Sequence, residues 1–527
     1  MGIYFNPGNS GFQEVVRSEY VDKTGLIALV NETIGTKNKL TCISRPRRFG
    51  KSFAAQMLCA YYDCSCDSHV LFDDKVISKM KGYSEHLNQY HVLNLDITHF
   101  LSAAQRKGIS VKEVPDLIVA ALWDELREIY PDCGREKDFT ASLVHCVEKT
   151  GKKFVFIIDE WDALIREAKD DVDAQKRYLN LLREWFKSNN VTPKVVAAAY
   201  MTGILPVKKD GSQSAISDFT EYPILAPDEF AEFTGFTEEE VRKLCKKHGM
   251  SFEEAKKWYD GYEFSEVGAI YNPYSVMQAM RKKKFGSYWQ RTSAAESLMT
   301  YINMNFEGLQ ETIASLIAGE DMEVKPERFE NDFKTFHSKD DVLTLLIHLG
   351  YLTWQEEDRT VRIPNEEVRI EFEKILEGTG VNAKWNELIE RSQKLLRDTI
   401  AGNGENVVKA IEAVRVTQYA PTFYNDEQAL RYVIKFAYIA AVDEYLKIEE
   451  LPSGKGIADV VYLPKRKSGL PALIVELKWN KSSEGAIGQI RSKEYPEILK
   501  DYGGEIVLVG INYNEKTKVH SCVIERV

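Results

Sequence analysis

The sequence lacks the features of several protein classes. No apolar run approaches the roughly 18 residues of a membrane-spanning helix, and the N-terminus has no basic segment followed by an apolar stretch. Lysine and arginine number 69 against 80 aspartate and glutamate residues, a net charge of −11, which argues against a surface covered with basic residues for non-specific nucleic-acid binding. We therefore expect a cytoplasmic protein with no membrane association, on which any nucleic-acid site is local.

Cysteine is scarce as well, with 8 residues in a chain of 527. The closest pair, Cys64 and Cys66, is spaced C-x-C, whereas zinc knuckles and thioredoxin-like sites use C-x-x-C. The sequence has no internal repeat and no low-complexity segment. With 44% hydrophobic and 28% charged residues, the composition is that of an ordinary globular protein. We expect reduced thiols and about three or four folded domains.

Short apolar runs alternate with amphipathic helical segments between residue 38 and about residue 200. The runs have the length and β-branched content of strands buried on both faces: Leu40–Ser44, His91–Ile97, Phe154–Asp159 and Val195–Tyr200. The predicted helices between and after them cover Ser52–Tyr62, Val111–Tyr130, Ala141–Lys149 and Ala174–Ser188. This alternation predicts an α/β domain over residues 1–230 with a parallel sheet covered by helices.

The remaining sequence changes pattern twice. After Pro227, helices rich in aromatic residues are expected, with no strand until residue 351. There an apolar helix stops at Gly350, and two short strands flank the charged turn Glu356–Arg359, which suits a winged-helix module. Further helices follow, including a long one over 425–446, before a strand–strand–helix–strand pattern. We expect a helical and winged-helix-like region at 231–381 and a second, smaller α/β domain at 382–527.

The first predicted strand leads into "SRPRRFGKS", which opens a helix, and this is the placement of a P-loop. Backbone N–H groups at a helix N-terminus can surround phosphate oxygens, Lys51 can neutralise them, and the Ser52 hydroxyl can complete the coordination of Mg²⁺. The full pattern has glycine where this chain has Arg45. For the GKS tripeptide alone, a cationic turn before a helix is the alternative. The candidate nucleotide-binding residues of the loop are Arg48, Phe49, Gly50, Lys51 and Ser52.

Two adjacent acids, Asp159 and Glu160, end the apolar strand "FVFIID" in a Walker B pattern. Asp159 would hold the Mg²⁺ through water, and Glu160 would act on the attacking water as general base. Ligands of open α/β sheets bind at this end of the strands. The next strand places Thr202 as a sensor residue beside the γ-phosphate. Acids that cap a helix after a core strand are the alternative interpretation.

The C-terminal region carries a second group of charged residues, Asp459, Glu476 and Lys478. Glu476 and Lys478 are two apart on a predicted strand and share one face. A strand, a turn and a return strand fit between Asp459 and Glu476. Two carboxylates can hold a divalent cation that polarises a phosphodiester, and a lysine can orient the attacking water or stabilise charge. A solvated ion pair on an edge strand is the alternative, although the flanking segment Leu473–Val475 is apolar.

Six segments together resemble the prokaryotic AAA-ATPase-like family whose members end in a PD-(D/E)xK nuclease domain. They are "YVDKTGLI" (20–27), "RPRRFGKS" (45–52), "TGILPVKK" (202–209), "WYDGYEF" (258–264), "IYNPYSV" (270–276) and "SYWQRTSA" (287–294). The resemblance implies an AAA/ASCE-type P-loop domain, in which arginine at the position of Arg45 is usual. It implies a nuclease motif at Asp459, Glu476 and Lys478.

The same resemblance extends to two further residues of the nuclease domain. Glu427 resembles an additional acid of several such nucleases, and Gln489 in "IGQIRSK" resembles the helix residue that follows the motif. Glu427 can equally be a first-turn helix acid favoured by the helix dipole.

Three functions are compatible with these residues. The first is an ATP-controlled nuclease that uses ATP, one Mg²⁺ at the P-loop and one or two at the nuclease site, and that acts on nucleic acid, DNA in preference to RNA. The second is a nucleotide-dependent switch that binds nucleic acid or a protein partner without cleaving, which the intact Asp459, Glu476 and Lys478 count against. The third, a translocating motor, ranks last because strand-gripping motifs are lacking. Homo-oligomer formation stays open.

Overall fold

The structure is a computed structural model, and it divides into two compact units, Met1–Glu307 with Glu323–Ile370 and Gly308–Met322 with Glu371–Val527. It describes residues 2–527 except 134–135, 169–170, 208–215, 290–305, 307–308, 318, 330–335, 337, 379–382, 419–429, 432, 435–436, 439–440, 442–444, 454–455, 465–468 and 493–503. Within the described residues, no helix has both the length and the apolar character to cross a membrane.

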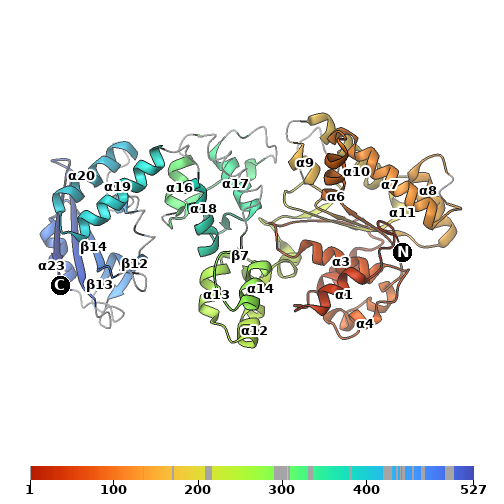
Figure 1. Cartoon of the computed structure of the whole chain (residues 1–527), viewed down its shortest axis with the longest axis horizontal. Coiled ribbons are helices and arrows are strands. Elements are labelled where there is room, and N and C mark those ends of the chain that lie inside the picture. Colours follow the sequence, from red (N-terminus) through yellow and green to blue (C-terminus); the bar gives the residue numbers. More distant parts are fainter. Residues whose placement is uncertain are drawn as a thin grey trace. The chain divides into compact units, whose positions relative to one another are not determined.

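A five-stranded parallel sheet forms the centre of the N-terminal domain (Figure 1). In spatial order its strands are β2 (His91–Asp96), β3 (Phe154–Asp159), β4 (Val196–Gly203), β1 (Leu40–Ser44) and β5 (Thr220–Tyr222). Each neighbouring pair is parallel. The insertion of β4 between β1 and β3 is the ASCE-type order, so the predicted α/β class and parallel sheet are confirmed.

Helices cover both faces of this sheet because its strands are apolar on both sides. Along β3, Val155 and Ile157 face one core while Phe156 and Ile158 face the other. The first core includes residues of α1 (Ser10–Arg17), α2 (Gly25–Thr33), α3 (Lys51–Tyr62), α4 (His69–Phe72) and α5 (Tyr83–His86). The second includes residues of α6 (Ile97–Lys107), α7 (Val114–Ile129), α8 (Phe139–Thr150), α9 (Ala163–Glu167), α10 (Val172–Phe186) and α11 (Thr192–Val195).

The expectation of a strand-free segment up to residue 351 is wrong. Three antiparallel strands in the order β6 (Phe236–Thr237), β8 (Gly268–Tyr271) and β7 (Tyr262–Phe264) accompany α12 (Glu238–His248), α13 (Phe252–Tyr259) and α14 (Pro273–Lys282). These strands have only two to four residues, too few for an alternating pattern to show in the sequence. Tyr259, the last residue of α13, and Tyr262, the first residue of β7, are both buried in the core of this region.

A helix followed by a hairpin lies where the winged-helix module is predicted. α17 (Lys339–Leu349) begins at a capping box between Ser338 and Asp341 and ends at Gly350, whose φ is +83°. β10 (Thr353–Gln355) then pairs antiparallel with β11 (Thr360–Arg362). The helix, its stop and the hairpin are thus confirmed, while the winged-helix assignment stays a prediction. The other elements here are α16 (Leu309–Ile317), β9 (Met322–Glu323) and α18 (Glu366–Gly378).

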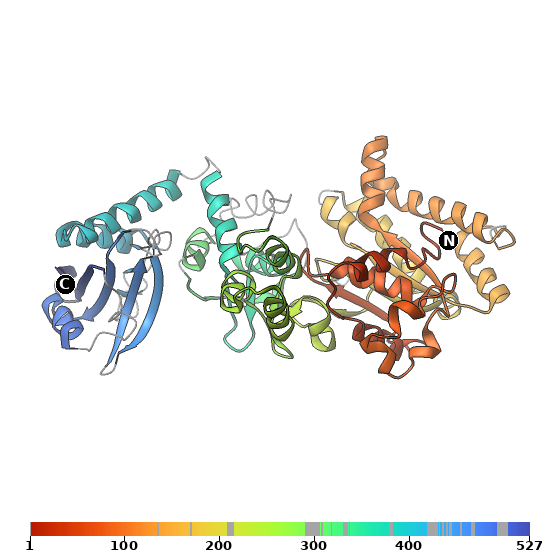
Figure 2. The same cartoon turned by 60° about the horizontal axis from the view of Figure 1, so that its bottom comes forward.

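The C-terminal region is a five-stranded sheet with helices on both faces (Figure 2). Its strands, in spatial order, are β12 (Tyr445–Ser453), β13 (Gly456–Pro464), β14 (Ala472–Trp479), β15 (Ile506–Asn514) and β16 (Val519–Arg526). One core joins the sheet to α19 (Ala383–Ile400) and α20 (Gly404–Gln418), and the opposite core joins it to α23 (Ser483–Ser492). Predicted β13, β14, α23 and β15 are confirmed; the predicted helix over 425–446 is too long, because Tyr445 already starts β12.

Candidate functional site

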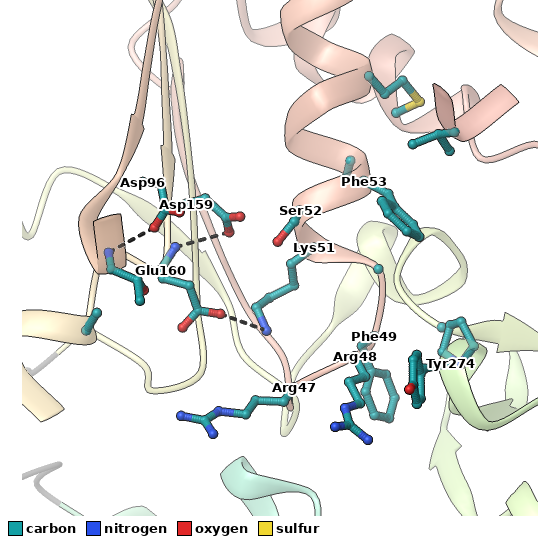
Figure 3. Close-up of a pocket in the computed structure, with 18 of the residues that line it drawn as sticks. Arg47, Arg48, Phe49, Lys51, Ser52, Phe53, Asp96, Asp159, Glu160 and Tyr274 are labelled. Atoms are coloured by element: carbon teal, nitrogen blue, oxygen red, sulfur yellow. Dashed lines mark hydrogen bonds and ion pairs between the residues drawn. The ribbon is translucent and has the colours of Figure 1, made fainter. Parts of the chain in front are cut away.

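The loop between β1 and α3 has the geometry of an anion-binding site. Gly50 has a φ of +88° at the N-cap of α3, a conformation that side chains disfavour. The first N–H groups of an α-helix have no intrahelical acceptor, so those of α3 are available to phosphate oxygens. Lys51 Nζ lies 3.0 Å from the carbonyl oxygen of Arg45, 2.9 Å from that of Pro46, and 3.7 Å from Glu160 Oε1 (Figure 3). The lysine is therefore held at the mouth of the loop, where phosphates would bind.

Asp159 meets two hydroxyl groups at the carboxyl end of β3. The Thr202 hydroxyl, on the neighbouring strand β4, donates a hydrogen bond to Asp159 Oδ1. Burial raises the pKa of Asp159, and hydrogen bonds from Ser52 and Thr202 offset this only in part. The structure thus brings Ser52, Asp159 and Thr202 together, while the predicted role of Thr202 as a sensor of the γ-phosphate stays a prediction.

Glu160 is held by cations in an uncommon backbone conformation. Its φ is +51°, a left-handed value that non-glycine residues adopt rarely and often at functional sites. Arg166 on α9 donates to Glu160 Oε2 and, through Nε at 3.0 Å, to Asp162 Oδ2. Burial by itself would raise the pKa of Glu160, but the charges of Lys51, Arg166 and Arg47 lower it below its usual value. Glu160 is thus an ionised carboxylate beside the loop lysine.

A cavity of about 1630 Å³ opens in front of these residues. The loop residues, Asp159 and Glu160 line it, together with side chains of α1, α6 and α14. The volume exceeds the roughly 300–1,000 Å³ of most small-molecule sites, so a nucleoside triphosphate with water fits. The donor set also fits Mg²⁺, because the Ser52 hydroxyl and the Asp159 carboxylate supply the hard oxygen ligands that this ion prefers.

Two of the predicted loop residues point away from the lysine. Arg48 donates to the Tyr288 carbonyl at 2.8 Å and lies over the Tyr274 ring, with 4.4 Å from its guanidinium carbon to the ring centroid. The Phe49 side chain is fully buried and packs edge-on against Tyr262. These side chains attach the loop to the segment after residue 230, so the contribution of Arg48 and Phe49 to a phosphate site would come from the backbone.

Arg45 fills the position where the P-loop pattern has glycine. Its side chain is fully buried, and burial lowers its pKa to about 10, so it stays protonated at neutral pH. The guanidinium donates to the Tyr222 carbonyl at 2.6 Å, to the Ser44 carbonyl at 2.9 Å and to Thr234 Oγ1 at 2.9 Å. Through these hydrogen bonds Arg45 connects the phosphate loop to β5 and to the segment after β5 that contains Thr234.

Replacing Arg45 by glycine, the residue of the general pattern, is expected to destabilise the N-terminal domain. Buried oxygens of Tyr222 and Thr234 would lose their charged donor, which costs about 2–4 kcal/mol. Chemical denaturation followed by tryptophan fluorescence measures the change. The control is Lys37→Gly, an exposed residue before β1, for which we expect a change within about 0.5 kcal/mol. An unfolding midpoint of Arg45→Gly equal to that of the wild type would contradict this role.

The second candidate site lies on the α23 face of the C-terminal sheet. Val460 pairs with Val475 in the antiparallel β13–β14 ladder, and continuing this register by one residue places Asp459 opposite Glu476. Residues opposite each other in such a pair point to the same face. Asp459 Oδ2 accepts a hydrogen bond from the Leu477 backbone N–H at 2.8 Å, which fixes its side chain over β14.

Glu476 connects the other predicted residues. Its Oε1 lies 3.1 Å from Lys478 Nζ and also accepts from the Gln489 amide on α23. Glu476 is 1% exposed and Lys478 7%, and β14 lies between β13 and β15. These values exclude the alternative of a solvated pair on an edge strand. Asp459, Glu476 and Lys478 therefore form one buried cluster, and the half-buried Gln489 adjoins it.

Arg431 completes the cluster and was not predicted. Its guanidinium lies 2.8 Å from Asp459 Oδ1. Glu427 lies outside the described residues. Among the residues that the structure describes, no group of three or more His, Cys, Asp or Glu side chains is arranged to hold a metal ion. The two carboxylates offer oxygen ligands suited to Mg²⁺, but a metal ion bound through Asp459 Oδ1 would have to displace the Arg431 contact.

Sequence reasoning missed further residues of the N-terminal site. Asp162 is fully buried and accepts from the backbone N–H groups of Ile204 and Leu205, at 3.2 and 2.9 Å, so it joins the ends of β3 and β4. Asp162 is the last residue of the acidic segment "DEWD" (159–162), and this segment could have indicated it in the sequence. Arg166 and Arg431 carried no such signal, because each acts through a helix that reaches its carboxylate only in the folded chain.

The fold and both sites define a P-loop ATPase-like domain of ASCE type, followed by a helical middle and a PD-(D/E)XK region. Family models agree: residues 8–212 match the model described as a predicted AAA-ATPase, and residues 425–522 match that of the PD-(D/E)XK nuclease superfamily. The resemblance inferred from the motifs is thus confirmed. These two domains give the chain ATPase and nuclease potential.

Individual relatives are distant. An "Uncharacterized protein in vnfD 5'region" of Azotobacter chroococcum mcd 1 is 21% identical over 525 residues, which cover 95% of this chain and 93% of that protein. Two solved structures share 10% identity and cover 69% of this chain and 98% of their own. They are the Aeropyrum pernix ORC2 protein in ADPNP–ADP complexes, with a TM-score of 0.33, and Cdc6p from Pyrobaculum aerophilum, with 0.23.

Proposed function

We propose that the N-terminal domain binds and hydrolyses ATP and thereby controls a Mg²⁺-dependent phosphodiesterase in the C-terminal domain that cuts nucleic acid, DNA in preference to RNA. One observation supports this most: Lys51, Asp159 and Glu160 converge at the carboxyl edge of a parallel sheet, in front of a cavity of about 1630 Å³. The two alternative interpretations, a cationic turn before a helix and a pair of helix-capping acids, do not explain why these three side chains lie together.

The residues divide the work of hydrolysis in this proposal. The N–H groups of α3 and Lys51 bind the phosphates, and a Mg²⁺ ion held by Ser52 and Asp159 would neutralise their charge. Glu160 orients a water molecule whose oxygen bonds to the γ-phosphorus while the bond to the bridging oxygen of ADP breaks. The water proton passes to the Glu160 carboxylate, and ADP and inorganic phosphate leave.

Lys51→Ala tests nucleotide binding. We expect ATP affinity to fall at least about 100-fold, because the variant removes the charge that lies at the mouth of the loop. Isothermal titration calorimetry with ATP and Mg²⁺ measures it, and Lys37→Ala, an exposed lysine before β1, is the charge-matched control. Equal affinity of wild type and Lys51→Ala would remove the P-loop interpretation.

Within the first unit, direct contacts connect the phosphate loop to the middle region, and bound nucleotide could act on that region through them. The loop touches this region at several points: Arg48 binds the Tyr288 carbonyl, and Phe49 packs on Tyr262, whose hydroxyl donates to the Gly350 carbonyl at 2.6 Å. A change of loop conformation on binding phosphate would act directly on the C-terminal end of α17. This supports the coupling we propose.

The alternative function, a switch that binds nucleic acid without cutting it, is favoured by one observation. Arg431, Lys478 and Gln489 already occupy oxygens of both carboxylates. One assay distinguishes the two functions: the protein is incubated with labelled single- and double-stranded DNA and RNA, in Mg²⁺ or Mn²⁺, with and without ATP. Cleavage supports the nuclease, and binding without cleavage under every condition supports the switch.

A further inference from the structure

The three arginines of the "RPRR" segment have different environments. Arg45 is buried and donates to three oxygens of the protein, and Arg48 is bonded to the Tyr288 carbonyl and stacked on Tyr274. Arg47, by contrast, has no hydrogen bond and no ion pair within 4 Å in the part of the chain that the structure describes. It is half-buried and lines the cavity of the phosphate loop.

The direction of Arg47 follows from the backbone of the loop. Arg48 has a φ of +70°, a left-handed value that is uncommon outside glycine and turns the chain between the two side chains. Figure 3 shows the result: Arg48 extends beside Phe49 and Tyr274, and Arg47 extends on the opposite side, where Glu160 lies. The Arg47 charge is close enough to contribute to the lowered pKa of Glu160.

Glu160 does not need Arg47 as a partner. Its Oε2 is bonded to Arg166, and its Oε1 faces Lys51 at 3.7 Å. A guanidinium that loses part of its hydration without gaining a protein partner is costly, and an anionic ligand would offset that cost. Arginine donates two parallel hydrogen bonds to phosphate oxygens, so phosphate matches the chemistry of this side chain.

We infer that Arg47 contacts the γ-phosphate of the bound nucleotide and stabilises the charge on its oxygens as the bond to ADP breaks. This inference rests on the proposed ATPase function and adds a catalytic residue to it. The guanidinium comes from the phosphate loop itself, so the chain supplies this positive charge without a second subunit. Lys51 and Arg47 would then hold the phosphate from the loop while Glu160 receives the proton of the attacking water.

The test compares Arg47→Ala and Arg47→Lys with wild type in the full-length protein. For Arg47→Ala we expect kcat for ATP hydrolysis to fall about 100-fold or more, ATP affinity to fall about 5- to 10-fold, and ADP affinity to stay within about 2-fold, because ADP has no γ-phosphate. Arg47→Lys should recover part of kcat, since lysine keeps the charge but loses the paired donors. Lys37→Ala, with the same loss of charge on an exposed residue, should behave as wild type.

A second measurement does not depend on turnover. Wild type should trap ADP with aluminium fluoride, which imitates the phosphate in transfer, and Arg47→Ala should not, although it binds ADP. Wild-type values of kcat, of the ATP-to-ADP affinity ratio and of trapping in Arg47→Ala would overturn the inference and leave the ATPase function intact. Failure of the wild type to bind either nucleotide would overturn the proposed function, and this inference with it.

Discussion

Replacing Glu160 by glutamine is expected to lower kcat for ATP hydrolysis by about 10²- to 10⁴-fold and to leave ATP affinity nearly unchanged. The amide has the size of the carboxylate and can still accept a hydrogen bond from Arg166, but it cannot take the proton of the attacking water. Asp159 and Lys51 remain in place to hold the nucleotide. Phosphate release under steady state and calorimetric titration with ATP measure the two quantities.

Glu128→Gln provides the matched control for this result. Glu128 is an exposed residue of α7, and the substitution changes the net charge by the same amount. We expect it to hydrolyse ATP at the rate of the wild type. Loss of both binding and hydrolysis in Glu160→Gln would assign that glutamate to nucleotide binding, and unchanged hydrolysis would remove it from the mechanism.

Replacing Asp459 by asparagine is expected to lower the rate of metal-dependent cleavage by about 10³-fold or more. The rate of ATP hydrolysis should stay near that of the wild type. The two sites use separate residues, so the substitution leaves the phosphate loop untouched. Binding of Mn²⁺, followed by electron paramagnetic resonance, should weaken in parallel, since Asp459 is a candidate ligand. Lys478→Ala should slow cleavage without releasing the metal, because lysine contributes charge and orientation only.

Glu405→Gln, an exposed substitution on α20, is the control for the nuclease site, and we expect it to cleave and to bind Mn²⁺ as the wild type does. Cleavage by Asp459→Asn at the wild-type rate would end the nuclease proposal. A wild type that binds nucleic acid but cuts none, with any metal or nucleotide, would favour the switch.

The sequence predicted the elements that have strong local signals. β1 and β3 begin and end where the apolar runs do, since strands buried on both faces need uninterrupted apolar residues. β6, β7 and β8 were missed because two to four residues are too short for a period to appear. The predicted helix over 425–446 overlaps the first two residues of β12, and the rest of β12 was not predicted, because its mixed apolar and polar residues form a strand only by pairing with β13.

Local residue patterns were enough to predict the chemistry of both sites: a lysine and a serine at a helix start, two acids at the end of a buried strand, and an aspartate, a glutamate and a lysine on two adjacent strands. The positively charged partners of the carboxylates could be identified only in the folded chain. Arg166 reaches Glu160 from α9, Arg431 reaches Asp459 from a segment 28 residues away, and Arg47 and Arg48 diverge although they are neighbours. The reason is that a side chain's partner depends on backbone direction and on long-range packing, which local residue patterns do not encode.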